Sequence, residues 1–358
     1  MTRQSYRIDR TGALSNLHRV TEPIPPLGAN DVLIEVRAIG LNFADIFAMF
    51  GLYSATPKGS FIPGLEYAGV VVECGQNVRH IALGDRVMGA IRFGAYTTHV
   101  VVDAQYVQPL PEGWSFLEGA AFLVQSLTAY YALKHLGGLE QFGAFSEQPA
   151  PTVLIHSAAG GVGLLAHRIA KTMMQGRVIT IGTIGNAAKR ALLEREGYDH
   201  VIVRSGSSRA SAEHFRAALQ SALDGRPLHL ILDSLGGSLM RVGYETLAPA
   251  GRVVCFGSAH LAFQGNRPNY PKLLWKYFQR PRFDPLQMIE DNKAILGFNL
   301  IYLWNNLPLL QQMVDELISM RLPKPFVGHV FPFEHLPEAL TMFQSGSTTG
   351  KVVITLEA

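Results

Sequence analysis

Residues 152–163 read TVLIHSAAGGVG, and this stretch decides the fold of the chain. Residues 152–156 are typical of a buried strand and lead into a turn of small residues. Apolar residues then recur at helical spacing, at Val162, Leu165, Ala166, Ile169, Ala170 and Met173. In such a strand–turn–helix unit, the turn glycines let the backbone approach a pyrophosphate, and the N–H groups of the first helical turn bind it. The stretch therefore predicts a dinucleotide site.

The dinucleotide pattern G-x-G-x-x-G is only partly met. Ala158 stands at the first position, and Gly160 and Gly163 hold the second and third. The second glycine makes room for phosphates and the third lets helix and strand pack closely, so the loss of the first is modest. Taken alone, the pattern fits any tight strand-to-helix turn equally well, and the neighbouring sequence has to decide.

The region after the second expected strand favours NADP(H) over NAD(H). An NAD enzyme places Asp or Glu about 20 residues after the glycines, where it binds the ribose 2′-hydroxyl. Here residues 182–185 read GTIG, Lys189 and Arg190 follow, and the first acid is Glu194. A carboxylate repels a 2′-phosphate, whereas a hydroxyl and a cation attract it. The alternative is that Lys189 and Arg190 are an ordinary solvated helix face.

Composition favours a compact enzyme. The 358 residues suffice for two domains, and 48% hydrophobic with 16% charged residues argue against a disordered or fibrous chain. A formal charge of +3 is too small to indicate nucleic acid. Two cysteines, Cys74 and Cys255, exclude a disulfide framework and a four-cysteine zinc site. No apolar run has the length of a signal peptide or a membrane span, so we expect a cytoplasmic protein.

The sequence changes its period in the middle third. Short Val- and Ile-rich runs predict a small sheet-rich first domain, with strands at 5–9, 32–39, 67–74, 86–89 and 98–103. Further on, strands at 177–181, 200–203, 229–233, 252–257 and 294–299 alternate with helices at 187–196, 212–223 and 238–247. With residues 152–156 they predict a doubly wound parallel sheet of Rossmann type. Strands at 327–333 and 351–356, around a helix at 337–344, have no place in that sheet and should rejoin the first domain.

The segment 265–288 interleaves five basic residues with five aromatic ones. The basic residues are Arg267, Lys272, Lys276, Arg280 and Arg282, and the aromatic ones are Tyr270, Trp275, Tyr277, Phe278 and Phe283. One interpretation is a surface for membrane headgroups, a partner or a lid. The other, which such stripes more often support, is a surface helix whose aromatic side chains face the core.

Eight short motifs carry a family resemblance over essentially the whole chain. They are GLNFAD and GLY within 40–53, PGLEYAG at 63–69, GDRV at 84–87, AAFLVQSLTAYYAL at 120–133, AAGGVG at 158–163, DSLGG at 233–237 and TGKVV at 349–353. Together they resemble the zinc-independent quinone oxidoreductase family of the medium-chain dehydrogenase/reductases. GLNFAD, the long insertion near 265–285 and residues 297–300 fit its VAT-1-like branch. The resemblance implies an α/β fold with a Rossmann NADPH-binding domain at 128–299 and a discontinuous, mainly-β GroES-like catalytic domain at 1–127 and 300–358.

The resemblance also implies that no metal takes part. Alcohol dehydrogenase relatives hold a catalytic zinc with a Cys, a His and a further ligand, but Asn42 and Leu65 stand at the Cys and His positions and leave Glu66 without metal partners. The two cysteines lie far apart in the sequence and cannot complete a ligand set. His80, His99 and His156 lack ligand spacing and are expected to be structural or surface residues.

Site residues follow from the resemblance by position. It implies that Asn42, Asp45 and Tyr53 line the cleft near the nicotinamide. The implied cofactor contacts are Thr128, Ala159, Gly160, Gly161, Val162, Gly182, Thr183, Lys189, Phe256, Gly257 and Phe298. Two departures weaken parts of this assignment: Phe47 replaces a tyrosine of many relatives, and a basic residue near the end of the cofactor site is missing around Gly346.

The predicted activity is hydride transfer from NADPH to a quinone or an α,β-unsaturated carbonyl compound. Asn42 and Tyr53 are predicted to donate hydrogen bonds to the developing oxyanion, with Asp45 orienting them. A helix cap for Asn42 and Asp45, and plain packing for Tyr53, are the structural alternatives. The rival function is a weakly catalytic, NADPH-binding protein of the VAT-1-like type, with peripheral membrane or partner contact through 265–288. Family resemblance further implies a homodimer formed by edge pairing of nucleotide sheets through 252–257 and 294–299.

Overall fold

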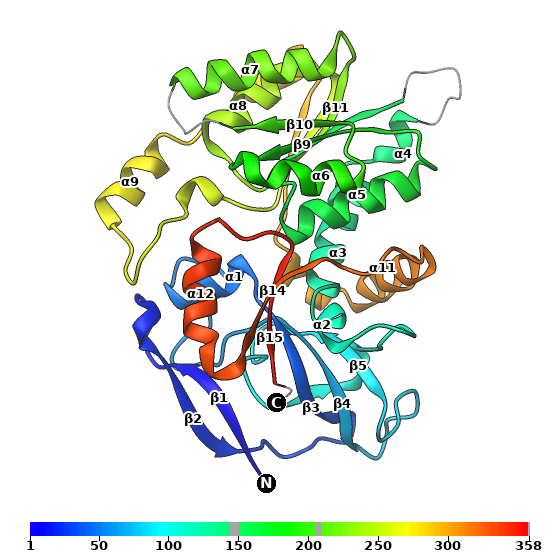
Figure 1. Cartoon of the computed structure of the whole chain (residues 1–358), viewed down its shortest axis with the longest axis vertical. Coiled ribbons are helices and arrows are strands. Elements are labelled where there is room, and N and C mark those ends of the chain that lie inside the picture. Colours follow the sequence, from blue (N-terminus) through cyan, green and yellow to red (C-terminus); the bar gives the residue numbers. More distant parts are fainter. Residues whose placement is uncertain (144–149, 205–208, 357–358) are drawn as a thin grey trace. The chain divides into compact units, whose positions relative to one another are not determined.

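The computed structural model describes residues 1–143, 150–204 and 209–356, which fall into two compact units (Figure 1). Unit 1 comprises Met1–Val124, Phe263–Asn269 and Lys324–Ala358. Unit 2 comprises Gln125–Ala262 and Tyr270–Pro323. The first unit is therefore discontinuous, because the C-terminal segment returns to it.

Unit 1 is built around a seven-stranded sheet. Its strands are β3 (Asp31–Gly40), β4 (Glu66–Cys74), β5 (Arg86–Ala90), β6 (His99–Asp103), β7 (Val107–Pro109), β14 (Val327–Pro332) and β15 (Lys351–Thr355). The order is β14-β15-β3-β4-β5-β7, with β6 also paired to β3. A separate antiparallel pair is formed by β1 (Thr2–Ile8) and β2 (Leu17–Pro23). Strand β15 pairs antiparallel with β3, so the tail completes this sheet as predicted.

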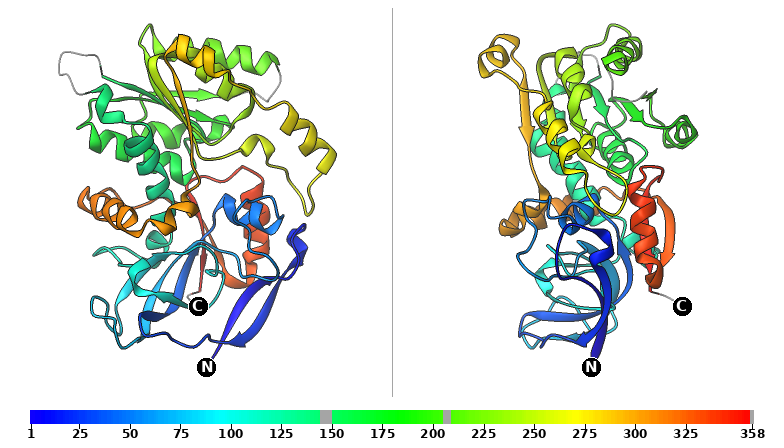
Figure 2. Two further views of the ribbon diagram at one scale, coloured as in Figure 1. Left: turned by 180° about the vertical axis from the view of Figure 1, so that it is seen from behind. Right: turned by 90° about the vertical axis from the view of Figure 1, so that its left-hand side faces the viewer.

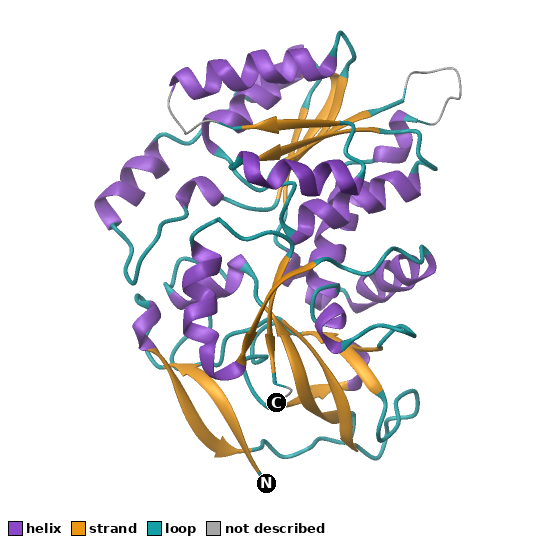
Figure 3. Ribbon diagram, in the orientation of Figure 1, coloured by secondary structure: helices purple, strands orange, loops and turns teal. Residues whose placement is uncertain are grey.

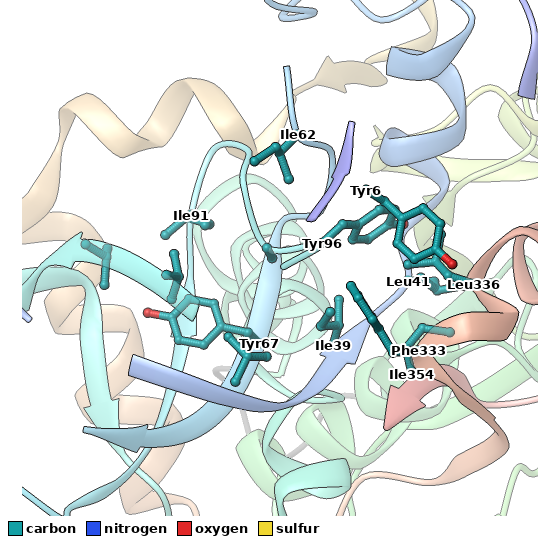
Figure 4. Close-up of a cluster of buried hydrophobic side chains, with 14 of the residues drawn as sticks. Tyr6, Ile39, Leu41, Ile62, Tyr67, Ile91, Tyr96, Phe333, Leu336 and Ile354 are labelled. Atoms are coloured by element: carbon teal, nitrogen blue, oxygen red, sulfur yellow. The ribbon is translucent and has the colours of Figure 1, made fainter. Parts of the chain in front are cut away.

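Three short helices and a dense aromatic core complete unit 1. The helices are α1 (Phe43–Met49), α2 (Phe116–Gly119) and α12 (Leu336–Gln344). Tyr67 and Tyr96 are fully buried in the cluster that Figure 4 shows, with Ile39 and Leu336 beside them. Strands β3 and β4 supply much of this core, through residues such as Val32, Ile34 and Val36, and most of both strands is buried on both faces.

Unit 2 contains the predicted Rossmann sheet. Its strands are β8 (Thr152–Ile155), β9 (Ile179–Ile184), β10 (His200–Val203), β11 (Leu228–Asp233), β12 (Leu247–Cys255) and β13 (Ala294–Gly297). They run parallel in the order β10-β9-β8-β11-β12-β13, which is the doubly wound order. The helices are α4 (Leu139–Phe142), α5 (Gly161–Met173), α6 (Arg190–Glu196), α7 (Arg209–Leu223), α8 (Gly237–Thr246), α9 (Tyr270–Phe278), α10 (Pro285–Asp291) and α11 (Leu307–Ser319). Figure 3 shows helices on both faces of this sheet, which confirms the expected fold class.

The limits of the two units differ from the predicted domain limits in three places. Residues 300–323, expected in the first domain, lie in unit 2, and Phe263–Asn269 lies in unit 1. Residues 125–127, also expected in the first domain, lie in unit 2 as well. The first difference has a visible cause, because Glu316 of α11 binds the hydroxyl of Tyr130 and, at 2.9 Å, the ammonium of Lys134 in unit 2. The second is caused by Asn266, whose carbonyl accepts from Leu14 N and whose Oδ1 accepts from Ser15 N at 2.7 Å.

Helix α9 overturns the core-packing interpretation of the basic aromatic segment. No residue of α9 is buried, and Figure 2 shows this yellow helix standing away from the parallel sheet of unit 2. Trp275 and Phe278 are each 61% exposed, and Tyr277 is 48% exposed. Phe283, after the helix, packs against a core residue, with its ring 4.9 Å from that of Tyr244, and Met288 packs against the same core.

Of the two strands expected to form a dimer edge, one lies at the end of the sheet and the other does not. Strand β13 lies at the end of the sheet and is available for pairing with another chain. Strand β12, in contrast, pairs with β11 on one side and β13 on the other. Residues 252–255 therefore cannot form an edge, because their main-chain groups already pair with β11 and β13.

Candidate functional site

The glycine turn after β8 has the geometry that close approach of a ligand backbone requires. Ser157 adopts a positive φ of 53°, and Gly160 N donates to its carbonyl at 2.9 Å before α5 begins at Gly161. A Cβ on Gly163 would lie 2.6 Å from Ala158 Cα, so only glycine lets α5 pack this closely. A Cβ on Gly160 would meet only Ser157 O within 4 Å, at 3.2 Å. The second glycine thus faces open space, which fits a pyrophosphate.

Strand β9 is longer than predicted, and this changes the role of two predicted residues. Gly182 and Thr183 lie inside the strand rather than in the turn after it. Thr183 is fully buried, and its Oγ1 lies 2.9 Å from Nδ1 of the buried His156. The side chain of Thr183 is therefore directed to the interior. The expectation that this hydroxyl attracts a 2′-phosphate has no support in the arrangement.

Lys189 and Arg204 bring two positive charges together beyond the ends of β9 and β10. Burial lowers the pKa of Lys189, and the nearby Arg204 charge lowers it further. Arg204 N donates to Ile184 O at 2.8 Å, and its buried Nε has no hydrogen-bond partner among the described residues. Burial also lowers the pKa of Arg204, while the buried Asp233 opposes this shift.

Sequence reasoning missed Arg204. The signal was a basic residue directly after the third strand of the sheet. Because β9 and β10 are parallel neighbours, their carboxyl ends meet at the same edge, and a residue after one lies near a residue after the other. Lys189 alone was assigned, since it follows the second strand in the sequence.

Three aromatic side chains meet at the ends of β12 and β13. The rings of Phe256 and Phe298, both predicted cofactor contacts, lie 6.1 Å apart. Tyr131, which was not predicted, lies 5.0 Å from Phe298. Tyr131 opens a π-helical turn, Tyr131–Leu136, directly after α3 (Leu123–Tyr130), which carries the predicted Thr128. Gln125 of α3 lies against Gly161, where a Cβ would be 2.0 Å from Gln125 Oε1.

In unit 1, Asn42 and Asp45 form the start of α1. Asn42 N donates to Asp45 Oδ2 at 2.8 Å, and Tyr96 OH donates to the same oxygen at 2.9 Å. Asp45 is fully buried, and its Oδ1 has no hydrogen-bond partner among the described residues. This burial raises the pKa of Asp45 to about 7. Asp45 thus contacts Asn42 as predicted, in the geometry that also caps a helix.

The side-chain amide of Asn42 is already engaged by the protein. Its Nδ2 donates to Glu66 Oε1 at 2.9 Å and to Gly40 O at 3.2 Å, and its Oδ1 accepts from Lys351 Nζ at 2.8 Å. Donation from Asn42 to a substrate would require one of these bonds to be exchanged. The predicted donor role of Asn42 therefore stays a prediction.

Tyr53 lies beyond the end of α1 and is half-buried. Its ring is edge-on to Phe93, with the centroids 6.5 Å apart, and it packs against the core of unit 1. The structure thus shows the packing alternative directly, whereas hydrogen-bond donation by Tyr53 to a substrate stays a prediction.

The described residues do not provide a metal site. Across residues 1–143, 150–204 and 209–356, no three His, Cys, Asp or Glu side chains gather closely enough to hold an ion. Glu66, the acidic residue of the PGLEYAG motif, instead binds the ammonium of Lys351. A resident zinc does not fit these side chains.

Comparison with known proteins decides the family. Residues 28–112 match the model of the alcohol dehydrogenase GroES-like domain, and residues 196–354 match that of the zinc-binding dehydrogenases. The chain is 33% identical over 335 residues to the synaptic vesicle membrane protein VAT-1 homolog of Rattus norvegicus, covering 92% of this chain and 78% of the relative. The chain belongs to the medium-chain dehydrogenase/reductase family. Within it, the VAT-1-like branch is the one that the relative indicates.

Two solved structures of this family are similar to the chain over almost its whole length. A mycobacterial protein solved in complex with NADPH has a TM-score of 0.80 at 25% identity, covering 99% of both chains. The quinone oxidoreductase of Pseudomonas syringae pv. tomato DC3000 has a TM-score of 0.76 at 26% identity, again covering 99% of both chains. These likenesses support an oxidoreductase of the NADP(H)-binding kind.

Proposed function

We propose that the protein is an NADPH-dependent reductase that passes hydride to quinones or α,β-unsaturated carbonyl compounds without a metal. Membership of the medium-chain dehydrogenase/reductase family and likeness to a quinone oxidoreductase support the reaction class. Bound NADPH would supply the hydride, and the chain has to bind, orient and shield the reacting groups.

Three groups of residues in unit 2 bind the cofactor in this proposal. The turn at Gly160 and the first turn of α5 hold the pyrophosphate with main-chain N–H groups. Lys189 and Arg204 hold the 2′-phosphate. Phe256 and Phe298 provide an apolar surface at the ends of β12 and β13 and exclude water from it.

The observation that carries the cofactor proposal is the pair of like charges formed by Lys189 and Arg204. Two cations brought together in a half-buried place repel each other, and a dianion between them would remove the repulsion. Residues 182–189 contain no acid, and the acid that acts on Arg204 is the buried Asp233 at the end of β11. The arrangement therefore favours a 2′-phosphate over a free ribose hydroxyl.

Calorimetric titration with two adenosine fragments tests this pair. Arg204→Met should weaken 2′,5′-ADP binding about 10- to 100-fold, the worth of a charge-assisted hydrogen bond, and leave 5′-AMP binding unchanged. Arg190→Met is the matched control, because Arg190 lies 3.8 Å from the carboxylate of Glu194 on the exposed face of α6. Equal losses for both fragments, or no loss, would refute the role of Arg204.

NADPH oxidation at 340 nm against a panel of quinones and enones, with NADH in parallel, tests the reaction itself. Turnover with NADPH preferred is expected. Tight NADPH binding without turnover on any acceptor would contradict the reductase and favour the second candidate. Light scattering tests the homodimer, which we propose pairs through β13; a monomer at all concentrations would refute it.

The second candidate is a weakly catalytic NADPH-binding protein that contacts membranes through α9. Between residues 265 and 283 there are five basic residues and no acid, and the exposed aromatic side chains of α9 lie among them. This combination suits an anionic lipid surface. None of the described helices is long and apolar enough to cross a bilayer.

Sedimentation with vesicles tests this candidate. Binding to phosphatidylserine-containing vesicles that is lost on Trp275→Ser, and in the Arg280→Gln/Arg282→Gln variant, would support it. No sedimentation of the wild-type protein would exclude it. The cytoplasmic location stays a prediction in either case.

A further inference from the structure

Lys351, Glu66 and Asn42 form a buried triad in unit 1 that the proposed reaction does not by itself explain. The side chains of Lys351 and Glu66 are each 1% exposed. Lys351 Nζ donates to Asn42 Oδ1 at 2.8 Å and binds Glu66 Oε1, while Asn42 Nδ2 donates to Glu66 Oε1 at 2.9 Å. The three residues come from β15, β4 and the turn before α1, and Lys351 follows Asn42 by 309 positions.

Stability is a poor reason for such a triad. Moving a carboxylate and an ammonium out of water costs several kcal/mol each, and an apolar pair of equal volume is often as stable or more stable. The surrounding fold is nevertheless shaped to hold the pair. A Cβ on Gly40 would lie 2.0 Å from the main-chain oxygen of Ala120, 2.7 Å from Lys351 Cε and 2.9 Å from Glu66 Cγ, so only glycine fits between the pair and the end of α2.

The triad makes hydrogen bonds to two segments that the proposed function uses. The first is the start of α1, because Lys351 takes the oxygen end of the Asn42 amide and leaves its N–H groups for Glu66 and Gly40. The second is the start of α3, because Glu66 Oε2 accepts from Val124 N at 3.2 Å. A carboxylate in the first turn of a helix accepts from an otherwise unpaired N–H group, and its negative charge interacts favourably with the positive end of the helix dipole.

We infer that Lys351 is a positioning residue, whose ammonium sets the orientation of the Asn42 amide and holds Glu66 at the start of α3. Without the ammonium, the Asn42 amide can rotate and Glu66 loses its fixed place. The inference deepens the proposed reductase function and rests on it for its catalytic readout, but the ordering of α1 and α3 can be measured without any turnover.

The Lys351→Met/Glu66→Gln double variant tests the inference. Methionine has nearly the length of lysine, and glutamine keeps one acceptor oxygen, which can serve Asn42 or Val124 but not both; no buried charge is left unpaired. NADPH affinity should change little, because the variant loosens only the first turn of α3, and the residues proposed for the pyrophosphate and the 2′-phosphate lie elsewhere in unit 2. We expect kcat to fall about 10- to 100-fold with little change in KM. Hydrogen exchange measured by mass spectrometry should be faster in peptides covering 42–49 and 123–126.

Lys324→Met is the matched control. Lys324 also pairs with a carboxylate of unit 1, at 3.2 Å from Glu118, but its side chain is 51% exposed, so its charge stays in contact with water. This variant should change neither kcat nor exchange at α1. If the double variant fails to fold by circular dichroism, Lys351→Gln/Glu66→Gln takes its place with the same expectations.

Wild-type kcat together with wild-type exchange in the double variant would overturn the inference. If the wild-type protein itself turns over no acceptor, the proposed function fails, and exchange alone decides the inference. Unchanged exchange at 42–49 and 123–126 would then overturn it, and faster exchange there, with the sheet of unit 2 unaffected, would support it.

Discussion

Replacing Asp45 by asparagine should make the stability of unit 1 less dependent on pH. Asp45 is fully buried, and burial raises its pKa from 3.8 to about 7. Asn42 and Tyr96 lower this pKa by hydrogen bonding, Lys351 lowers it by its charge, and Glu66 raises it. Burial outweighs the other effects, so the fold favours the protonated carboxyl.

The sign of the effect follows from linkage. A carboxyl whose folded pKa lies above its unfolded pKa contributes its full stability below pH 3.8 and loses it as the pH rises through 7. Each pKa unit corresponds to about 1.4 kcal/mol, and the two-site titration gives a loss of about 2.5 kcal/mol between pH 5 and pH 8. Asparagine does not titrate. The difference in unfolding free energy between Asp45→Asn and the wild-type protein should therefore grow by about that amount over this range.

Hydrogen exchange of unit 1 peptides in increasing guanidinium measures this difference, and it avoids treating a two-unit chain as two-state. Asp45→Asn also loses or gains fixed hydrogen-bond energy, but that offset is the same at every pH. Tyr96→Phe removes a donor to Asp45 Oδ2 and should move the loss of stability to higher pH. Parallel pH curves for the wild-type protein and Asp45→Asn would refute the reasoning, because they would mean that Asp45 titrates alike in the folded and unfolded chain.

Two further substitutions follow from the buried polar groups. Tyr67→Phe should leave the unfolding free energy of unit 1 in guanidinium unchanged or raise it by about 1 kcal/mol. The reason is that the buried Tyr67 hydroxyl has no hydrogen-bond partner among the described residues. A fall in unfolding free energy of more than about 1 kcal/mol would contradict this. Glu316→Gln should destabilise unit 2 by about 1 kcal/mol after solvent screening, since Glu316 binds Tyr130 and Lys134. These bonds lower the pKa of Glu316 to about 2, so the effect should be complete above pH 4.5 and disappear as the pH falls towards 2. A pH-independent difference between Glu316→Gln and the wild-type protein would contradict this assignment.

Local pattern predicted the elements of the chain well where period and turn chemistry were strong. The strand at 200–203 and the helix at 238–247 lie within one residue of β10 and α8. Strand β9 was placed too early, because the GTIG segment has the small residues of a turn but is extended and buried between β8 and β10. The aromatic residues of segment 265–288 were expected to face the core, because aromatic stripes on helices usually pack there. Helix α9 is exposed instead, because no neighbouring element covers its aromatic face, and its own sequence does not show this.

The candidate site divides in the same way. Gly160 and Gly163 were identified from spacing, since a turn between a strand and a helix is built from consecutive residues. The proximity of Lys189 to Arg204 was not identified from the sequence, because it depends on β9 and β10 being neighbours in the sheet. The engagement of the Asn42 amide by Lys351 was also missed, although TGKVV was noticed as a motif.

The sequence by itself determined the nucleotide-binding unit and the return of the tail to the first unit, and its two cysteines exclude a four-cysteine zinc site. These depend on the period of apolar residues, on glycine positions and on composition, all of which are local or additive. Only the tertiary structure decided which polar groups share a buried place. Strand order brings Lys351 to Asn42 across 309 positions, and burial then gives the contact its strength, because a charge removed from water must find its partner within the fold.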